Sequence, residues 1–142
     1  MDPEIILFDT DTYIDYMRQN PDVMGYVSVI GEASVFVNTI VYAELLYKSV
    51  SKAELAKLET RLSGLSIINI NSEIADIFTE TFKQYILSHR PAIPDMMIAA
   101  TCLYYDIPLF TFNKKDFAYI TGLRLIEHDI KPMPRKGGSW FF

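Results

Sequence analysis

The sequence has little of several features, and each shortage excludes a class of protein. Its single cysteine, Cys102, cannot form an internal disulfide and lies in the apolar stretch MMIAATCLYY, where we expect a small core residue. No hydrophobic run approaches the ~20 residues of a membrane-spanning helix. The N-terminus, MDPE, is acidic, and only four apolar residues precede Asp9, which is not the pattern of a signal peptide. The sequence therefore predicts a cytoplasmic protein with no membrane span.

Positive charge is also in short supply. The chain has 13 lysines and arginines against 18 aspartates and glutamates, which gives a net charge of −5. This balance argues against a protein that binds nucleic acid by charge alone. It does not exclude a nuclease, because metal cations at a carboxylate cluster can supply positive charge where the phosphate binds.

The 142 residues show no internal repeat and are enough for one domain with its own core. Short β-rich runs alternate with longer helical patterns. The runs lie at residues 5–8, 34–37, 66–70, 108–111 and 123–126, and the helical patterns at 10–20, 22–30, 39–49, 51–62, 72–89 and 94–106. This alternation predicts an α/β fold, with a central parallel sheet of about five strands covered by helices on both faces.

Four carboxylates stand where such a sheet would place its functional site, at the carboxyl ends of the strands. Asp9 directly follows the first run, and Glu44 lies in the helical pattern after the second. Asp95 is in the first turn of the helix that leads into the fourth run, and Asp116 lies shortly after that run. Four clustered carboxylates repel one another, and hard divalent cations such as Mg²⁺ or Mn²⁺ are their natural counter-charge.

Each of these residues also has a purely structural interpretation. Asp95 would favour the dipole of its helix, and Asp9 could be a helix N-cap. Glu44 could form a surface pair with Lys48 at i, i+4, and Asp116 could be an ordinary loop charge beside two lysines. Singly the four signals are weak, and it is their combination that favours a metal site.

The stretches ILFDTDTYIDYM, NTIVYAELLYKS and IPDMMIAATCLYYDIPLFTFNKKDF together resemble a known family. The chain is similar to PIN-domain ribonucleases, in particular to the VapC-like toxins of toxin–antitoxin pairs. The match runs from about Ile5 to about Glu127. Its most specific part is the last stretch, in which an Asp and a helix of small residues precede a strand and then T-x-N-x-x-D-F.

The resemblance implies roles for individual residues. Asp9, Glu44, Asp95 and Asp116 match the family's acidic metal-binding quartet. Three polar residues match positions that support it, namely Thr10, Thr111 and Asn113. The resemblance also implies Mg²⁺- or Mn²⁺-dependent endonucleolytic cleavage of RNA, a three-layer PIN-like fold, a homodimer, and inhibition by a small antitoxin protein.

One departure from the family pattern is Asp11, where Asn is usual. This fifth carboxylate could add to metal binding, but we favour a role in capping the following helix. The pair Asp9 and Asp11 also allows a second hypothesis, a phosphatase of the haloacid-dehalogenase type. Tyr13 replaces the Thr or Val of that signature, and the chain ends too soon for the later acidic pair. A third hypothesis is a catalytically silent PIN-like module that binds RNA or protein.

Basic and aromatic residues remain to be placed. Lys114 and Lys115 are candidate substrate contacts near the predicted edge, as are Lys48 and Arg90, although a solvated face explains each of them more simply. His89 and His128 lack ligand-like neighbours and are interpreted as structural or exposed. We expect residues 1–130 to form the nuclease domain and residues 131–142 a C-terminal tail, whose aromatic residues dock on the protein's own surface or on a dimer partner.

Overall fold

A parallel sheet lies at the centre of the computed structural model, which describes residues 4–135. Its strand order is β3-β2-β1-β4. The strands are β1 (Ile6–Phe8), β2 (Val35–Asn38), β3 (Ser66–Ile68) and β4 (Leu109–Phe110). All three residues of β1 and both residues of β4 are buried, as solid apolar strands are when helices cover both faces of a sheet.

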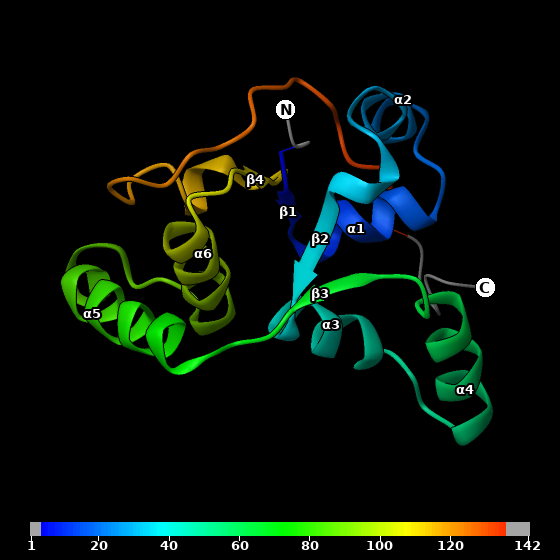
Figure 1. Ribbon diagram of the computed structural model, residues 1–142, viewed down its shortest axis with the longest axis horizontal. Coiled ribbons are helices and arrows are strands. Elements are labelled where there is room, and N and C mark those ends of the chain that lie inside the picture. Colours follow the sequence, from blue (N-terminus) through cyan, green and yellow to red (C-terminus); the bar gives the residue numbers. More distant parts are fainter. Residues whose placement is uncertain (1–3, 136–142) are drawn as a thin grey trace.

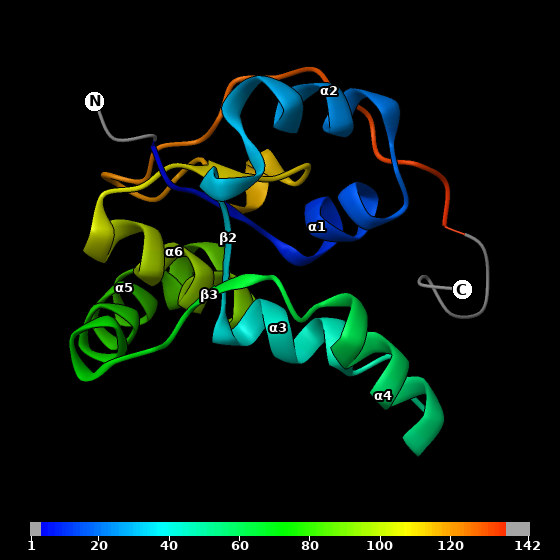
Figure 2. The same cartoon turned by 45° about the vertical axis from the view of Figure 1, so that its right-hand side comes forward.

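Six α-helices flank this sheet within the described residues. They are α1 (Thr10–Met17), α2 (Pro21–Ile30), α3 (Thr39–Leu46), α4 (Lys52–Arg61), α5 (Ser72–His89) and α6 (Ile93–Tyr105). Figures 1 and 2 show α5 and α6 packed together on one side of the sheet and α1 with α2 on the other. The predicted three-layer α/β fold is confirmed. No helix between residues 4 and 135 is long and apolar enough to cross a membrane.

Side-chain caps explain where several helices begin. Asn38, Ser51 and Asn71 each accept a hydrogen bond from the backbone N–H three residues later. The predicted capping role of Asp11 is wrong. The cap of α1 is Asp9, whose Oδ1 accepts from the N–H of Thr12, while Asp11 lies within the first turn of the helix.

The fifth β-rich run, residues 123–126, makes only one isolated bridge, between Leu125 and Leu109 of β4. Two backbone hydrogen bonds, Leu109 to Arg124 and Ile126 to Leu109, hold this bridge. Pairing stops after this bridge because the carbonyl of Thr111, which follows β4, contacts a side chain instead of another strand. That side chain is the imidazole of His128, whose Nε2 lies 2.8 Å from the Thr111 oxygen.

The sheet register aligns the residues that follow β1, β2 and β4. Leu7 pairs with Phe36 of β2, and Phe8 pairs with Phe110 of β4. Extended along parallel strands, this register places Asp9 level with Asn38 on one side and Thr111 on the other. Polar side chains from three separate parts of the sequence therefore meet at one edge of the sheet.

The segment after residue 126 crosses the molecule from the β4 side to α1 and α2 (Figure 2). Asn20 Nδ2 donates to the carbonyl of Lys131, and Asp15 accepts from the backbone N–H of Met133 at 2.8 Å. Asp15 is fully buried and also accepts from Arg135 Nη1 at 2.5 Å. The start of the predicted tail is thus attached to α1, while its aromatic residues Trp140, Phe141 and Phe142 lie outside the described residues.

Candidate active site

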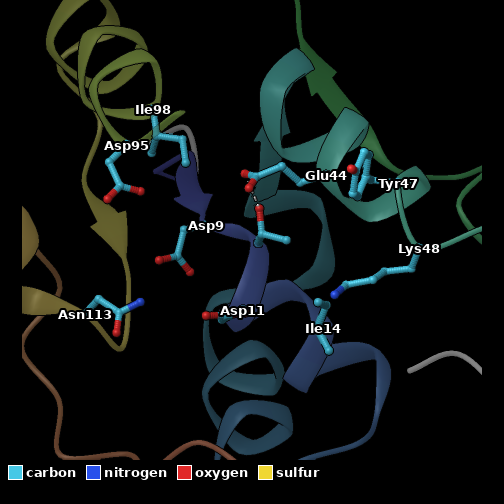
Figure 3. Close-up of a pocket in the computed structure, with 10 residues that line it drawn as sticks. Asp9, Asp11, Ile14, Glu44, Tyr47, Lys48, Asp95, Ile98 and Asn113 are labelled. Carbon is cyan, nitrogen blue, oxygen red and sulfur yellow. Dashed lines mark hydrogen bonds between the residues drawn. The ribbon is translucent and has the colours of Figure 1, made fainter. Parts of the chain in front are cut away.

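A cleft of about 290 Å³ opens at the carboxyl edge of the sheet. Figure 3 shows carboxylates from three different elements facing it. They are Asp9 after β1, Glu44 of α3 and Asp95 of α6. The complete lining is Asp9, Thr10, Asp11, Ile14, Glu44, Tyr47, Lys48, Asp95, Ile98 and Asn113. Three of the four predicted quartet residues therefore share one cleft.

Asp9 is held rigidly at the floor of this cleft. Its Oδ1 accepts from the backbone N–H and, at 2.6 Å, from the hydroxyl of Thr12, and its Oδ2 accepts from the Thr111 hydroxyl at 2.5 Å. Burial raises the pKa of Asp9, while these hydrogen bonds act in the opposite direction. Thr111 also accepts from the N–H of Asn113 at 3.0 Å, which fixes its hydroxyl toward the carboxylate.

Glu44 is positioned through two polar contacts at the edge of the sheet. Thr10 Oγ1 donates to Glu44 Oε1 at 2.8 Å, so the residue after Asp9 orients the second carboxylate. Asn38, which starts the helix of Glu44, is fully buried and donates from Nδ2 to Thr101 Oγ1 of α6 at 3.0 Å. Asn38 therefore both caps the helix of Glu44 and ties it to the helix of Asp95.

Burial and the neighbouring carboxylates both raise the pKa of Asp95. Its pKa is raised from 3.8 to about 6, first by burial and then by the charges of Asp116, Asp9, Glu44 and Asp11. No hydrogen-bond donor or cationic side chain within residues 4–135 pairs with the Asp95 carboxylate. The site therefore concentrates negative charge without a counter-charge from this part of the protein.

The remaining predicted residues are divided between two hollows that both include Asp95. Asn113 lines the first cleft, whereas Asp116 and Lys115 border a second hollow that also includes Asp95. Lys114 turns away and donates to the backbone carbonyl of His128. The alternative interpretation of Glu44 as a surface ion pair with Lys48 is not realised within residues 4–135, and Lys48 lines the first cleft.

The donor chemistry of the site fits a hard divalent cation. The oxygen atoms of Asp9 and Asp95 would hold it, with Glu44 and Asp116 near enough to act on Asp95 electrostatically. Within residues 4–135 no three carboxylate, imidazole or thiol side chains gather closely enough to hold a metal by themselves. Mg²⁺ does not need such a cage, because it usually keeps several waters and binds through one or two carboxylates.

The raised pKa of Asp95 predicts a pH dependence of metal-free stability. Because the folded-state pKa, about 6, exceeds the ordinary 3.8, the folded protein binds more protons between these values than the unfolded chain. Stability without metal is therefore expected to fall as the pH rises from about 4 to about 6. We expect Asp95→Asn to flatten this part of a curve of urea midpoint against pH in chelator, and an unchanged slope would contradict the assignment.

Arg135, a basic residue of the predicted tail, makes contacts close to the site that the sequence did not indicate. Arg135 donates from Nη2 to the carbonyl of Asp11 at 3.1 Å and lies 3.8 Å from its carboxylate. It also pairs with buried Asp15. No local pattern indicates this contact, because 120 residues separate Arg135 from Asp15.

Comparisons with known proteins agree with this architecture. The sequence matches the PIN domain family over residues 6–123. A search of curated proteins gives no match. Among solved structures, the chain is similar to VapBC2 from Rickettsia felis bound to a promoter DNA fragment, with 25% identity, a TM-score of 0.74, and coverage of 88% of this chain and 99% of that one.

Two further structures show the same fold. A toxin–antitoxin complex from Klebsiella pneumoniae is 25% identical, with a TM-score of 0.69 and coverage of 88% and 99% of the two chains. VapBC from Salmonella typhimurium bound to DNA is 22% identical, with a TM-score of 0.73 and coverage of 87% and 97%. The chain thus belongs to the PIN domain family of nucleases, and its predicted resemblance to VapC-like toxins is confirmed.

Proposed function

We propose that this protein is a metal-dependent endoribonuclease that hydrolyses RNA phosphodiester bonds and acts as the toxin of a toxin–antitoxin pair. The observation that carries the proposal is Asp95, a half-buried carboxylate with a pKa of about 6, whose acidic neighbours surround an open cleft in a PIN fold. A purely structural cluster of acids would be expected to have cationic partners. Here the Asp95 carboxylate has none within residues 4–135.

The proposed chemistry assigns a role to each carboxylate. When bound, Mg²⁺ or Mn²⁺ lowers the pKa of a water and offsets the charge that develops on the phosphate. Asp9 and Asp95 would hold the cation, with Asp116 beside Asp95, and the Thr111 hydroxyl fixes the orientation of Asp9. Glu44 completes this set or accepts the proton of the attacking water, and its hydrogen bond from Thr10 aims the carboxylate at the cleft.

The proposed partners are an RNA substrate, a small antitoxin and a second copy of the chain, in the cytoplasm. The similarity to toxin–antitoxin complexes supports the antitoxin. A separate groove of about 300 Å³ also supports an antitoxin partner, and its wall includes Tyr13, Tyr16 and Met17 of α1. Partly apolar grooves of this kind suit an amphipathic segment of another protein.

Cleavage of a mixed single-stranded RNA by the purified protein tests the proposal. The reaction is run with Mn²⁺, with Mg²⁺ and with chelator, for the wild type, for Asp95→Asn and for the control Asp76→Asn. Asp76 is an exposed aspartate of α5, away from both clefts. We expect cleavage that requires metal, is lost in Asp95→Asn and persists in Asp76→Asn.

Two other outcomes would count against this function. Cleavage that survives chelator or Asp95→Asn would point to a contaminating nuclease or to a different site. No cleavage together with no metal-dependent rise in melting temperature would favour a silent PIN-like binding module, since a ligand that binds only the folded state must stabilise it.

The hydroxyl of Thr111 is expected to matter for activity without touching the metal itself. Thr111→Val keeps the shape of the side chain but removes the donor to Asp9 Oδ2. Loss of such a supporting contact typically lowers metal affinity or activity by about 10–100-fold. We expect a loss of this size in cleavage rate or in the Mn²⁺ titration midpoint, with near-normal values for Thr111→Ser. Equal behaviour of the two variants would show that the hydroxyl is not what matters.

A further inference from the structure

A second hollow shares Asp95 with the first cleft. It measures about 310 Å³ and lies where the end of α5 and the start of α6 meet η2 (Lys114–Asp116). Asp95 lines both hollows, and Asp116 lines only this one. A chain that passes through the carboxylate cluster would therefore extend into this hollow. Its other walls carry His89, Arg90, Lys115 and Tyr119.

His89 and Tyr119 form a flat aromatic platform in this hollow. Their rings stack with centroids 3.8 Å apart and planes inclined by 8°. Tyr85 packs edge-on against Tyr119 at 5.0 Å, and its hydroxyl accepts from the N–H of Thr121 at 3.1 Å. Ser88 Oγ lies 2.8 Å from His89 Nδ1 and holds the imidazole in place. His89 is exposed although one face of its ring is covered, so a planar group can still stack on it.

Two cations stand beside this platform without partners. Neither the Arg90 guanidinium nor the Lys115 ammonium makes a hydrogen bond or an ion pair with residues 4–135, although Asp95 and Asp116 line the same hollow. Arg90 also has a left-handed backbone with φ of 47°, where glycine or asparagine would be favoured on conformational grounds. Two cations of a chain whose net charge is −5 thus lie beside the stacked rings.

We propose that this hollow binds one nucleotide of single-stranded RNA next to the scissile phosphodiester, an inference that rests on the proposed nuclease function. The base stacks on the imidazole of His89, and Arg90 with Lys115 contacts the adjoining phosphate. Flat rings combined with cations are the means by which proteins hold unpaired nucleotides. Because the overall charge repels RNA, these local cations supply the attraction that the acidic site lacks.

Binding of a short fluorescent single-stranded RNA tests the two cations. The measurements use fluorescence anisotropy with Mg²⁺ in an Asp9→Asn background, which keeps the RNA intact and leaves this hollow unchanged, since Asp9 does not line it. We expect Arg90→Ala and Lys115→Ala each to weaken binding several-fold and to reduce the slope of log K against log salt by about 0.7. Lys83→Ala is the matched control, because Lys83 is an exposed cation of α5 outside the hollow.

Stacking is tested separately at His89. With 2-aminopurine placed at successive positions of the RNA, one position is expected to show quenching that His89→Ala relieves and His89→Phe retains. His89→Ala is expected to weaken binding by about 5–10-fold. Tyr105→Ala, at an exposed aromatic residue near the end of α6, is the control. Thermal melts of each variant check that the fold is retained.

The possible outcomes distinguish failure of the proposed nucleotide site from failure of the proposed nuclease function. RNA binding by the Asp9→Asn protein that is unchanged by the Arg90, Lys115 and His89 substitutions would overturn the nucleotide site and leave the nuclease standing. Absence of RNA binding by the Asp9→Asn protein, together with absence of cleavage by the wild type, would overturn both. Reduced binding with equal loss in His89→Ala and His89→Phe would replace stacking with a hydrogen bond from the imidazole.

Discussion

Asparagine in place of Asp9 is expected to abolish RNA cleavage while leaving the metal-free protein as stable as the wild type or more stable. Loss of a residue that merely supports a metal ligand typically costs about 10–100-fold, so loss of a ligand itself should cost at least about 100-fold. The side chain sits between Thr12 and Thr111 with little exposure, and no other described carboxylate occupies its place at the end of β1.

The stability part of this prediction follows from the contacts of Asp9. An asparagine Oδ1 can still accept from the N–H of Thr12 and cap α1, and its amide can donate to the Thr111 oxygen. The substitution also removes a carboxylate whose pKa burial has raised, so the unfavourable burial of its charge disappears near neutral pH. Repulsion with Asp95 falls at the same time.

Thermal melting in chelator and RNA cleavage with Mn²⁺ measure the two halves of this prediction. Asp9→Ala is the matched comparison, because it also removes the charge but loses the cap. Loss of a side-chain cap typically costs about 1 kcal/mol. We expect Asp9→Ala to melt below Asp9→Asn, with both inactive. A lower metal-free melting temperature for Asp9→Asn than for the wild type would contradict clustering of the carboxylates.

Alanine in place of Asp15 is expected to lower the free energy of unfolding by about 3 kcal/mol, a large effect for a residue outside the active site. Asp15 is fully buried and accepts from Arg135, from the backbone N–H of Met133 and from Asn20. Its removal leaves three donors without their acceptor, and an unsatisfied donor is costly when it is buried.

Arg135→Ala separates the ion pair from the other contacts of Asp15. We expect a smaller loss, about 1–2 kcal/mol, because the Arg135 side chain is 37% exposed and Asp15 keeps its other two donors. Urea unfolding monitored by circular dichroism measures both variants, with Asp76→Ala as the exposed control. A larger loss for Arg135→Ala than for Asp15→Ala would mean that the buried carboxylate is not the centre of this attachment.

The identity and order of most elements follow from local sequence. Helix caps such as Asn38, Ser51 and Asn71 act on N–H groups three residues away, so a short window of sequence contains both partners. The same is true of apolar runs and of helical periodicity. The carboxyl ends of parallel strands lie at the same edge of a sheet. This rule predicted from sequence that Asp9, Glu44 and Asp95 lie in one region.

Sequence patterns left other features of the site undetermined. Asp9 precedes the helical pattern at 10–20 and Asp11 lies at its start, and only the backbone geometry showed that Asp9 is the cap and that Asp11 contacts Arg135. The run at 123–126 had the composition of a strand, yet the contact of His128 with Thr111 limits its pairing to one bridge. Both features depend on which of several nearby polar groups forms a given hydrogen bond in the folded protein.

The sequence by itself therefore determined the α/β class, most of the helix starts and the candidate acidic residues, because the patterns behind them span only a few residues. The tertiary structure alone decided that Asp95 faces two hollows, that Asn38 ties α3 to α6, and that Arg135 reaches Asp15. These contacts join residues tens to more than a hundred positions apart. Which residues meet in these contacts depends on how the whole chain packs, and a local sequence pattern contains no information about that.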